Sequence, residues 1–97
     1  MKHNRLTITA TLSAKEPLRY TPAGIPVLNV RLTHQSEQIE AGRPRRVECE
    51  LPGVALGEVA TKLAAVELQQ ERQFSGFLVT TRKYEMPELH VVEFIEA

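Results

Sequence analysis

Two short segments of this chain place basic side chains directly beside a tyrosine. One contains Arg19 and Tyr20, and the other consists of Arg82, Lys83 and Tyr84. A cation that neutralises a phosphate releases its counterions, and a flat aromatic ring stacks on an unpaired base. The repeated combination therefore predicts a surface for single-stranded nucleic acid, provided that the fold brings the two segments together.

Further candidate binding residues lie between these segments: Arg31, His34, Arg43, Arg45 and Arg46. In the alternating pattern of the strands described below, Arg31 and Arg46 point outward, and His34 ends the second strand. Arg43 and Arg45 are expected in a long polar loop.

Two features of the sequence oppose a nucleic-acid interface. Glu48 and Glu50 are predicted to point outward from the same strand, where carboxylates would repel phosphate. Tyr20 and Tyr84 can also be explained as side chains that pack against their own loops. These alternatives stay open at the level of sequence.

The charges are balanced overall but unevenly distributed. The chain has 97 residues with 12 basic and 12 acidic side chains, and every acidic residue is a glutamate. Residues 1–46 hold eight Lys and Arg against three Glu, whereas the remaining 51 residues hold four against nine. This asymmetry indicates a basic face, although chance segregation in so short a chain is an equally good explanation.

No set of side chains predicts catalysis. His3, His34 and His90 are isolated from one another, and neither the single Cys49 nor a carboxylate lies at metal-ligand spacing from them. Cys49 falls on the inward side of its strand pattern, so we expect a small buried side chain. Without a glycine-rich phosphate loop or any aspartate, we expect no enzyme, no metal and no cofactor.

Hydrophobic periodicity predicts five strands and one helix in a single domain, residues 1–97. The strands are expected at 5–13, 25–33, 45–53, 73–81 and 89–96, and the helix at 54–69. Pro52 and Gly53 should end the third strand, and Gly76 should mark a bend or bulge in the fourth. The polar stretch 35–44 reads as a long mobile loop.

The order of three strands, a helix and two strands is that of the OB-fold, an all-β, five-stranded barrel with one short helix between strands three and four. An open α+β sheet with the same order is the alternative. In an OB-fold the ligand face is formed by strands two and three and by the loops that join strands one and two and strands four and five. The two basic-aromatic segments occupy these two loops.

The sequence also indicates a compartment. No apolar run approaches the ~18 residues that span a bilayer, and the N-terminus lacks the features of a signal peptide. A single cysteine fits a reducing environment. We therefore expect a cytoplasmic protein with no membrane partner.

Four segments resemble the PriB family (primosomal replication protein N), bacterial relatives of single-stranded DNA-binding proteins. They are "NRLTITATL", "PLRYTPAGIPVLNVRLTHQS", "EAGRPRRVECELPGVA" and "FSGFLVTTRK". The resemblance implies a homodimeric OB-fold protein of the replication restart primosome. It implies that the protein binds single-stranded DNA, stabilises the restart helicase at abandoned forks and helps a helicase-loading component to reload the replicative helicase. Arg19, Arg82 and Lys83 match basic DNA-contacting positions of the family.

The chain also departs from that family. Glu48 stands where the family's well-known member has an exposed tryptophan, Arg43 where it has an aromatic residue, and Gln35 where it has an arginine. Glu88 lies near an expected lysine. Because stacking contributes ~1–3 kcal/mol per base, we expect weaker and more electrostatic binding. A protein–protein adaptor with vestigial DNA binding is the alternative function.

Overall fold

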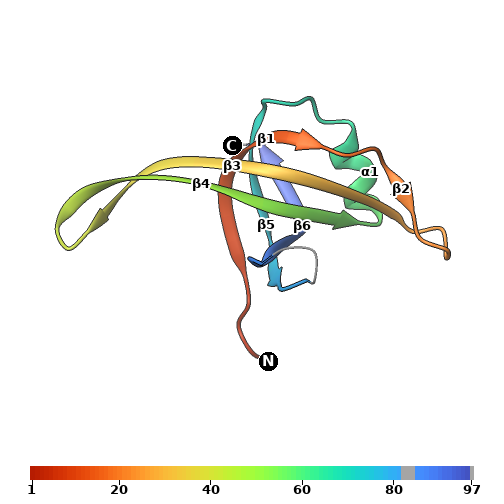
Figure 1. The fold of residues 1–97 in the computed structure, drawn as a ribbon, viewed down its shortest axis with the longest axis horizontal. Helices are drawn as coiled ribbons and strands as arrows, with labels where there is room; N and C mark the ends of the chain where they lie inside the picture. The colour runs from red at the N-terminus through yellow and green to blue at the C-terminus, as the bar shows by residue number, and fades with distance from the viewer. Residues whose placement is uncertain (82–84, 97) are drawn as a thin grey trace.

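The computed structural model describes residues 1–81 and 85–96 of the chain. Six strands and one helix occur in these residues (Figure 1). They are β1 (Leu6–Lys15), β2 (Arg19–Tyr20), β3 (Pro26–Glu40), β4 (Arg43–Leu56), α1 (Glu58–Ala64), β5 (Glu71–Val79) and β6 (Glu88–Glu96). The predicted order is confirmed, and β2 adds a two-residue strand in the first predicted loop.

The five long strands close into a barrel because β1 pairs with two neighbours. Its residues Leu6–Thr11 pair with β5, and its residues from Thr11 to Lys15 pair with β3, with a register shift between Leu12 and Ala14. Strand β6 pairs with β5 in an antiparallel ladder and with β4 in a short parallel ladder, and β4 pairs with β3. The OB-fold prediction is thus confirmed, and the open-sheet alternative is wrong.

The core comes from the inward positions of the alternating strands. The largest fully buried side chains are Leu12, Leu28, Leu32, Pro52, Leu63, Phe74 and Leu89. Helix α1 contributes Leu63 and Ala60 to the same cluster. Burial of one such leucine or phenylalanine contributes roughly 1.5–3 kcal/mol, so this cluster is the main source of stability.

Strands β3 and β4 continue beyond the barrel as a two-stranded ribbon (Figure 1). We call residues 35–48 the arm. The turn at its tip is Ala41–Gly42, and both residues have positive φ, 52° and 75°, as a two-residue hairpin requires. The arm extends the molecule to 50 Å along its longest axis, and the radius of gyration is 14.2 Å, whereas about 12.5 Å is expected for a compact chain of this length.

The prediction of a loop at 35–44 is therefore wrong. The residues read as a loop because the arm has no buried face, so its strands lack the apolar alternation that identifies half-buried strands. The prediction that Cys49 is buried fails for the same reason. Cys49 pairs with His34 where the ribbon leaves the barrel, and its side chain is exposed.

The third strand and the helix also have different bounds from those predicted. Pro52 and Gly53 do not end the strand, because Gly53, Val54 and Ala55 form the parallel ladder with β6. The β6 ladder begins only after Pro52, which suits a residue without a backbone N–H. The helix is limited to Glu58–Ala64, since Val54–Leu56 belong to β4.

Gly76 lies at the bulge that the sequence predicts. The β5–β6 register shifts between Ser75 and Gly76. A Cβ at Gly76 would overlap the carbonyl oxygen of His90 and lie 2.8 Å from its carbonyl carbon. Only glycine allows the two backbones to approach this closely.

The described residues contain no helix that is long and apolar enough to cross a membrane.

Helix α1 ends against β1, where the Lys15 ammonium donates hydrogen bonds to the carbonyl oxygens of Ala64 and Val66, at 2.7 and 2.6 Å. These carbonyls belong to the helix C-terminal turn, where a cation is favoured.

We predict that Lys15→Met lowers the free energy of unfolding by about 1.5–3 kcal/mol, because it leaves two carbonyl groups without their charged donor. Urea unfolding followed by circular dichroism measures this loss. Lys62→Met is the matched control, since the Lys62 side chain is exposed on α1 and forms a solvent-exposed ion pair with Glu58. Equal stability of the two variants would contradict the role assigned to Lys15.

Candidate nucleic-acid interface

The outer surface of β3 and β4 is the face on which an OB-fold binds its ligand. Residues that are paired across an antiparallel ladder share one face, so the register defines this surface. We call it the ligand face and define it by its polar residues, which are Asn29, Arg31, Thr33, Gln35, Glu37, Arg46, Glu48 and Glu50. It begins on the barrel and continues along one side of the arm.

Arg19 and Tyr20 lie at the barrel end of the ligand face. Strand β2 pairs with the start of β3, and Arg19 Nη2 donates a hydrogen bond to Asn29 Oδ1 at 2.9 Å. The turn that follows is fixed by hydrogen bonds of Thr21, Gly24 and Ile25, including Ile25 N–H to Thr21 Oγ1 at 3.1 Å. Tyr20 is 63% exposed, so its ring is accessible rather than packed against its own loop.

Two arginines on the ligand face form ion pairs with glutamates of the same face. Arg31 lies 3.5 Å from Glu50, and Arg46 lies 3.1 Å from Glu48. The exposed fractions of these four side chains range from 46% for Arg31 to 80% for Arg46. Ion pairs of this kind contribute only about 0–1 kcal/mol, so a phosphate can replace the carboxylate at low cost.

Arg43 and Arg45 lie on β4 and not in a loop, which corrects their predicted place. Their cross-strand partners are Glu40 and Gln38, which are on the opposite face of the arm from Arg46. Arg45 forms an ion pair with Glu40 at 2.8 Å. The arm therefore carries arginines on both of its faces, and the charge near its tip is partly neutralised.

The ring of His34 is partly buried, and both of its nitrogens are hydrogen-bonded within the protein. Its Nδ1 lies 2.6 Å from the carbonyl oxygen of Thr9, and its Nε2 lies 2.7 Å from Ser36 Oγ. Because a carbonyl only accepts, Nδ1 carries the proton and donates to Thr9, while Nε2 is hydrogen-bonded to the serine hydroxyl. His34 thus links the base of the arm to β1 and has no ring nitrogen left for a ligand.

The second basic-aromatic segment, Arg82, Lys83 and Tyr84, lies outside the described residues. Its predicted meeting with Arg19 therefore stays a prediction. Within the residues that the structure describes, no group of three or more His, Cys, Asp or Glu side chains could hold a metal ion.

The structure adds polar residues that sequence reasoning did not select. Asn29 fixes the guanidinium of Arg19, and Thr33 Oγ1 donates a hydrogen bond to Ser13 Oγ at 2.9 Å. The alternation of β3 already predicts that Asn29 and Thr33 point away from the core, so this pattern could have identified them as surface residues. Their partners depend on the register of β1 and β2, which the sequence pattern does not determine.

A closed barrel with an arginine-bearing β3–β4 face defines an OB-fold protein of the single-strand binding class. The chain matches the model of a family described as "another single-strand binding protein family" over residues 4–93. Replication restart protein PriB of Bordetella pertussis is 46% identical over 80 residues, which cover 82% of this chain and 75% of that protein. The chain belongs to the PriB family of single-strand binding proteins.

Other relatives and solved structures agree with this assignment. Replication restart protein PriB of Neisseria meningitidis serogroup A is 41% identical, with 94% of this chain and 92% of the relative covered. The structure of PriB from Ralstonia solanacearum superposes with a TM-score of 0.88 at 32% identity and covers 98% of both chains. The single-stranded DNA-binding protein of Thermus aquaticus shares the fold, with a TM-score of 0.74 at 23% identity over 95% of this chain and 48% of its own.

We predict that Glu48→Gln and Glu50→Gln each strengthen binding of single-stranded DNA by roughly two- to five-fold, because each substitution frees an arginine from a weak ion pair. Fluorescence anisotropy with labelled oligo-dT at low salt measures the change. Glu96→Gln removes the same charge from β6 and serves as the control. Unchanged affinity in both ligand-face variants would show that this face does not contact DNA.

Proposed function

We propose that this chain is a non-enzymatic, cytoplasmic accessory protein of replication restart that binds single-stranded DNA along the ligand face. The observation that carries the proposal is the accessible Arg19–Tyr20 pair, placed at the end of a polar strand surface that bears Arg31 and Arg46. Membership in the PriB family and relatives named replication restart protein PriB support it.

The proposed binding is electrostatic and weak. From Asn29 to Glu37 the ligand face extends about 26 Å along β3, at ~3.3 Å per residue. A DNA strand on this path contacts Arg19 first and then Arg31 and Arg46. Its phosphates replace the carboxylates as the ion-pair partners of Arg31 and Arg46. Among the described residues Tyr20 alone offers an accessible tyrosine ring, so stacking adds little.

The proposal includes two protein partners and a second copy of the chain. The restart helicase and the helicase-loading component are the expected partners, by resemblance to the family. An open sheet edge supports the homodimer: β1 pairs with β5 from Leu6 onward, whereas its ladder with β3 starts only at Thr11. Exposed edges of this kind are usually covered in native proteins.

We predict that sedimentation equilibrium of the pure chain gives a mass of twice 10.9 kDa, because a second copy covers the β1 edge. Thr7→Pro removes a backbone donor from this open edge, because the Leu12 N–H points toward β5 and residues at odd positions of the strand point the other way. It should shift the mass toward the monomer. A monomer at all micromolar concentrations of the unmodified chain would contradict the homodimer.

We predict that oligo-dT binds in a salt-dependent manner, because cations on the ligand face release counterions from the DNA. The slope of log K against log salt should be about −0.7 for each phosphate that is neutralised. The double variant Arg31→Gln and Arg46→Gln should make the slope less steep by about 0.7–1.4, which corresponds to one or two fewer neutralised phosphates. Arg72→Gln, on β5, is the control. No binding at low salt, or a flat slope, would contradict the DNA part of the proposal.

The second candidate function is a protein–protein adaptor with vestigial DNA binding. It is favoured by Glu48 and Glu50, which neutralise arginines on the ligand face. Co-purification of the chain with its restart helicase, with and without a forked oligonucleotide, separates the candidates. The adaptor is supported if the chain shows no measurable DNA binding and if charge reversal at Arg82 and Lys83 leaves helicase binding intact.

A further inference from the structure

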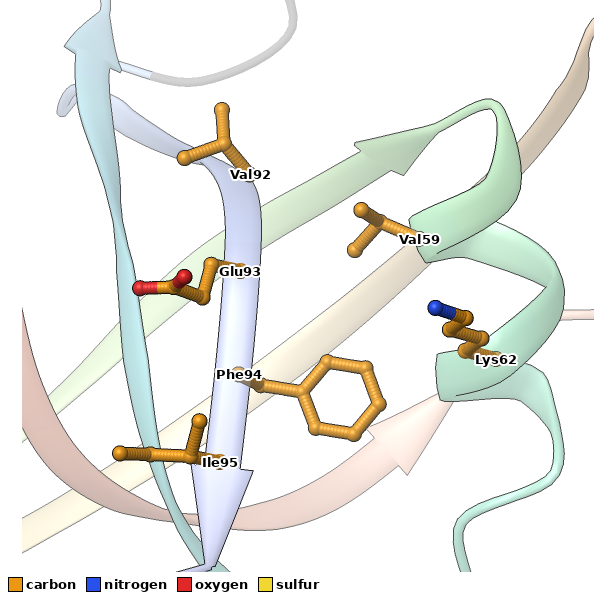
Figure 2. Close-up of a pocket in the computed structure, with 6 residues that line it drawn as sticks. All are labelled: Val59, Lys62, Val92, Glu93, Phe94 and Ile95. Carbon is orange, nitrogen blue, oxygen red and sulfur yellow. The ribbon is translucent and has the colours of Figure 1, made fainter.

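Two of the hollows on the surface of the molecule differ in what lines them. The hollow between α1 and β6, of about 450 Å³, is lined mainly by apolar side chains, and Figure 2 shows Val59 and Phe94 pointing toward each other across it. Both of these side chains pack against the core. The two charged residues of this hollow, Lys62 and Glu93, already form ion pairs within the protein. The hollow is therefore a packing contact between helix and strand.

The other hollow lies where the barrel closes, and its lining is entirely polar. Its volume is about 280 Å³, and it is lined by Thr11, Thr33, Gln35, Gln69 and Glu71. We call it the closure pocket. Thr11 is paired with Thr33 of β3 and with Glu71 of β5, so one row of side chains crosses three neighbouring strands on the outer surface. The pocket therefore depends on the double pairing of β1 at Thr11.

Hydrogen bonds hold the backbone of the closure pocket in place. The Leu12 N–H donates to the carbonyl oxygen of Gln70 at 3.1 Å, and the Gln69 N–H donates to the carbonyl oxygen of Leu12 at 2.8 Å. These two bonds fix the segment that carries Gln69 against β1. Thr11 and Thr33 are half-buried, and the other three lining residues are exposed. The threonines thus form the floor of the pocket, and the longer side chains form its rim.

Most polar groups of the closure pocket are available to a ligand. Within the part of the chain that the structure describes, the side chains of Thr11, Gln35, Gln69 and Glu71 form no hydrogen bond or ion pair with the protein. A carboxylate only accepts hydrogen bonds, whereas an amide both donates and accepts. Because the residues that line the pocket include no Lys or Arg, it does not favour an anion such as phosphate. It favours an uncharged group that offers N–H donors to the carboxylate and an acceptor to an amide.

The closure pocket opens on the proposed path of DNA. Thr33 and Gln35 belong to the ligand face, and Gln35 lies between Arg31 and the ladder position of Arg46, which is paired with Glu37. From residue 31 to residue 37 the distance along β3 is ~20 Å, at ~3.3 Å per residue. A strand whose phosphates contact both arginines therefore passes the mouth of the pocket. This favours a base of the bound strand as the occupant over a free small molecule.

We propose that the closure pocket binds guanine within single-stranded DNA, an inference that rests on the proposed function. Unpaired bases are recognised through hydrogen bonds to their Watson–Crick edges. The N1–H and N2–H₂ groups of guanine lie side by side and match the two oxygens of the Glu71 carboxylate, and its O6 accepts from the amide of Gln35 or Gln69. Thymine has one N–H between two carbonyl groups, and adenine and cytosine each offer a single amino group. These three bases satisfy a carboxylate less completely than guanine does.

The test compares labelled oligo-dT with the same oligonucleotide carrying one central deoxyguanosine, by fluorescence anisotropy at low salt. We expect the guanine-containing strand to bind at least about five-fold more tightly, the lower end of what one bidentate base contact discriminates. Hypoxanthine in place of guanine lacks the N2 amino group and should remove most of this preference.

Glu71→Gln should reduce the ratio of the two affinities to about one. Because the readout is a ratio, a general effect of the lost charge on DNA binding cancels. Glu58→Gln removes the same charge from α1, outside the pocket, and is the matched control that should keep the ratio of the unmodified chain. Gln69→Gly deletes a rim side chain at a residue with a φ of 66°, which glycine adopts readily, and should also lower the ratio.

The possible failures are distinguishable. Equal affinity of the unmodified chain for the two oligonucleotides, or a preference that Glu71→Gln leaves intact, overturns the guanine site and leaves the proposed function standing. Absence of binding to either strand at low salt overturns both. Guanosine monophosphate that binds as tightly as the guanine-containing strand would identify a site for a free nucleotide and contradict recognition of a base within DNA.

Discussion

The double pairing of β1 is the constraint on which the rest of the structure depends. Its residues from Leu6 to Thr11 pair with β5, and its residues from Thr11 to Lys15 pair with β3, with a register shift between Leu12 and Ala14. Without that switch of partners the sheet would stay open, and β3 would have no fixed place relative to β5 and β6. The orientation of the ligand face and of the arm follows from this closure, and the His34 contact with the Thr9 carbonyl reinforces it.

The arm has no core of its own, and an isolated two-stranded ribbon is at most marginally stable. It is held by its continuity with the barrel, by His34 at its base and by exposed ion pairs such as Arg45–Glu40. Exposed pairs are weak and easily exchanged. Under the proposed function, the glutamates are weak partners of the arginines that the phosphates of DNA replace.

The fold was largely predictable because five strands have one buried face, and alternation such as Leu28, Val30 and Leu32 shows it directly. The arm could not be predicted in this way, since both of its faces are exposed and its Ala41–Gly42 turn is not a strong hairpin signal. The same limit applies to Cys49, whose position in the alternation is inward but which is exposed where the ribbon leaves the barrel.

The site was predictable in its residue types but not in its pairing. The outward positions of Arg31 and Arg46 follow from alternation, whereas their ion pairs depend on the β3–β4 register. The link from His34 to Thr9 and the contacts of Lys15 with the end of α1 join residues far apart in sequence. Such contacts follow from closure of the barrel, which no local pattern describes.

The central claim is that DNA replaces glutamate as the partner of the arginines on the ligand face. NMR of the arginine Nε–Hε groups during titration with oligo-dT tests it most directly. The account predicts that the signals of Arg31 and Arg46 shift and saturate together with the bound fraction of DNA. The signal of Arg5, which forms an ion pair with Glu93 of β6 at 3.9 Å, should stay unchanged. Binding of DNA with no change at Arg31 and Arg46 would contradict it.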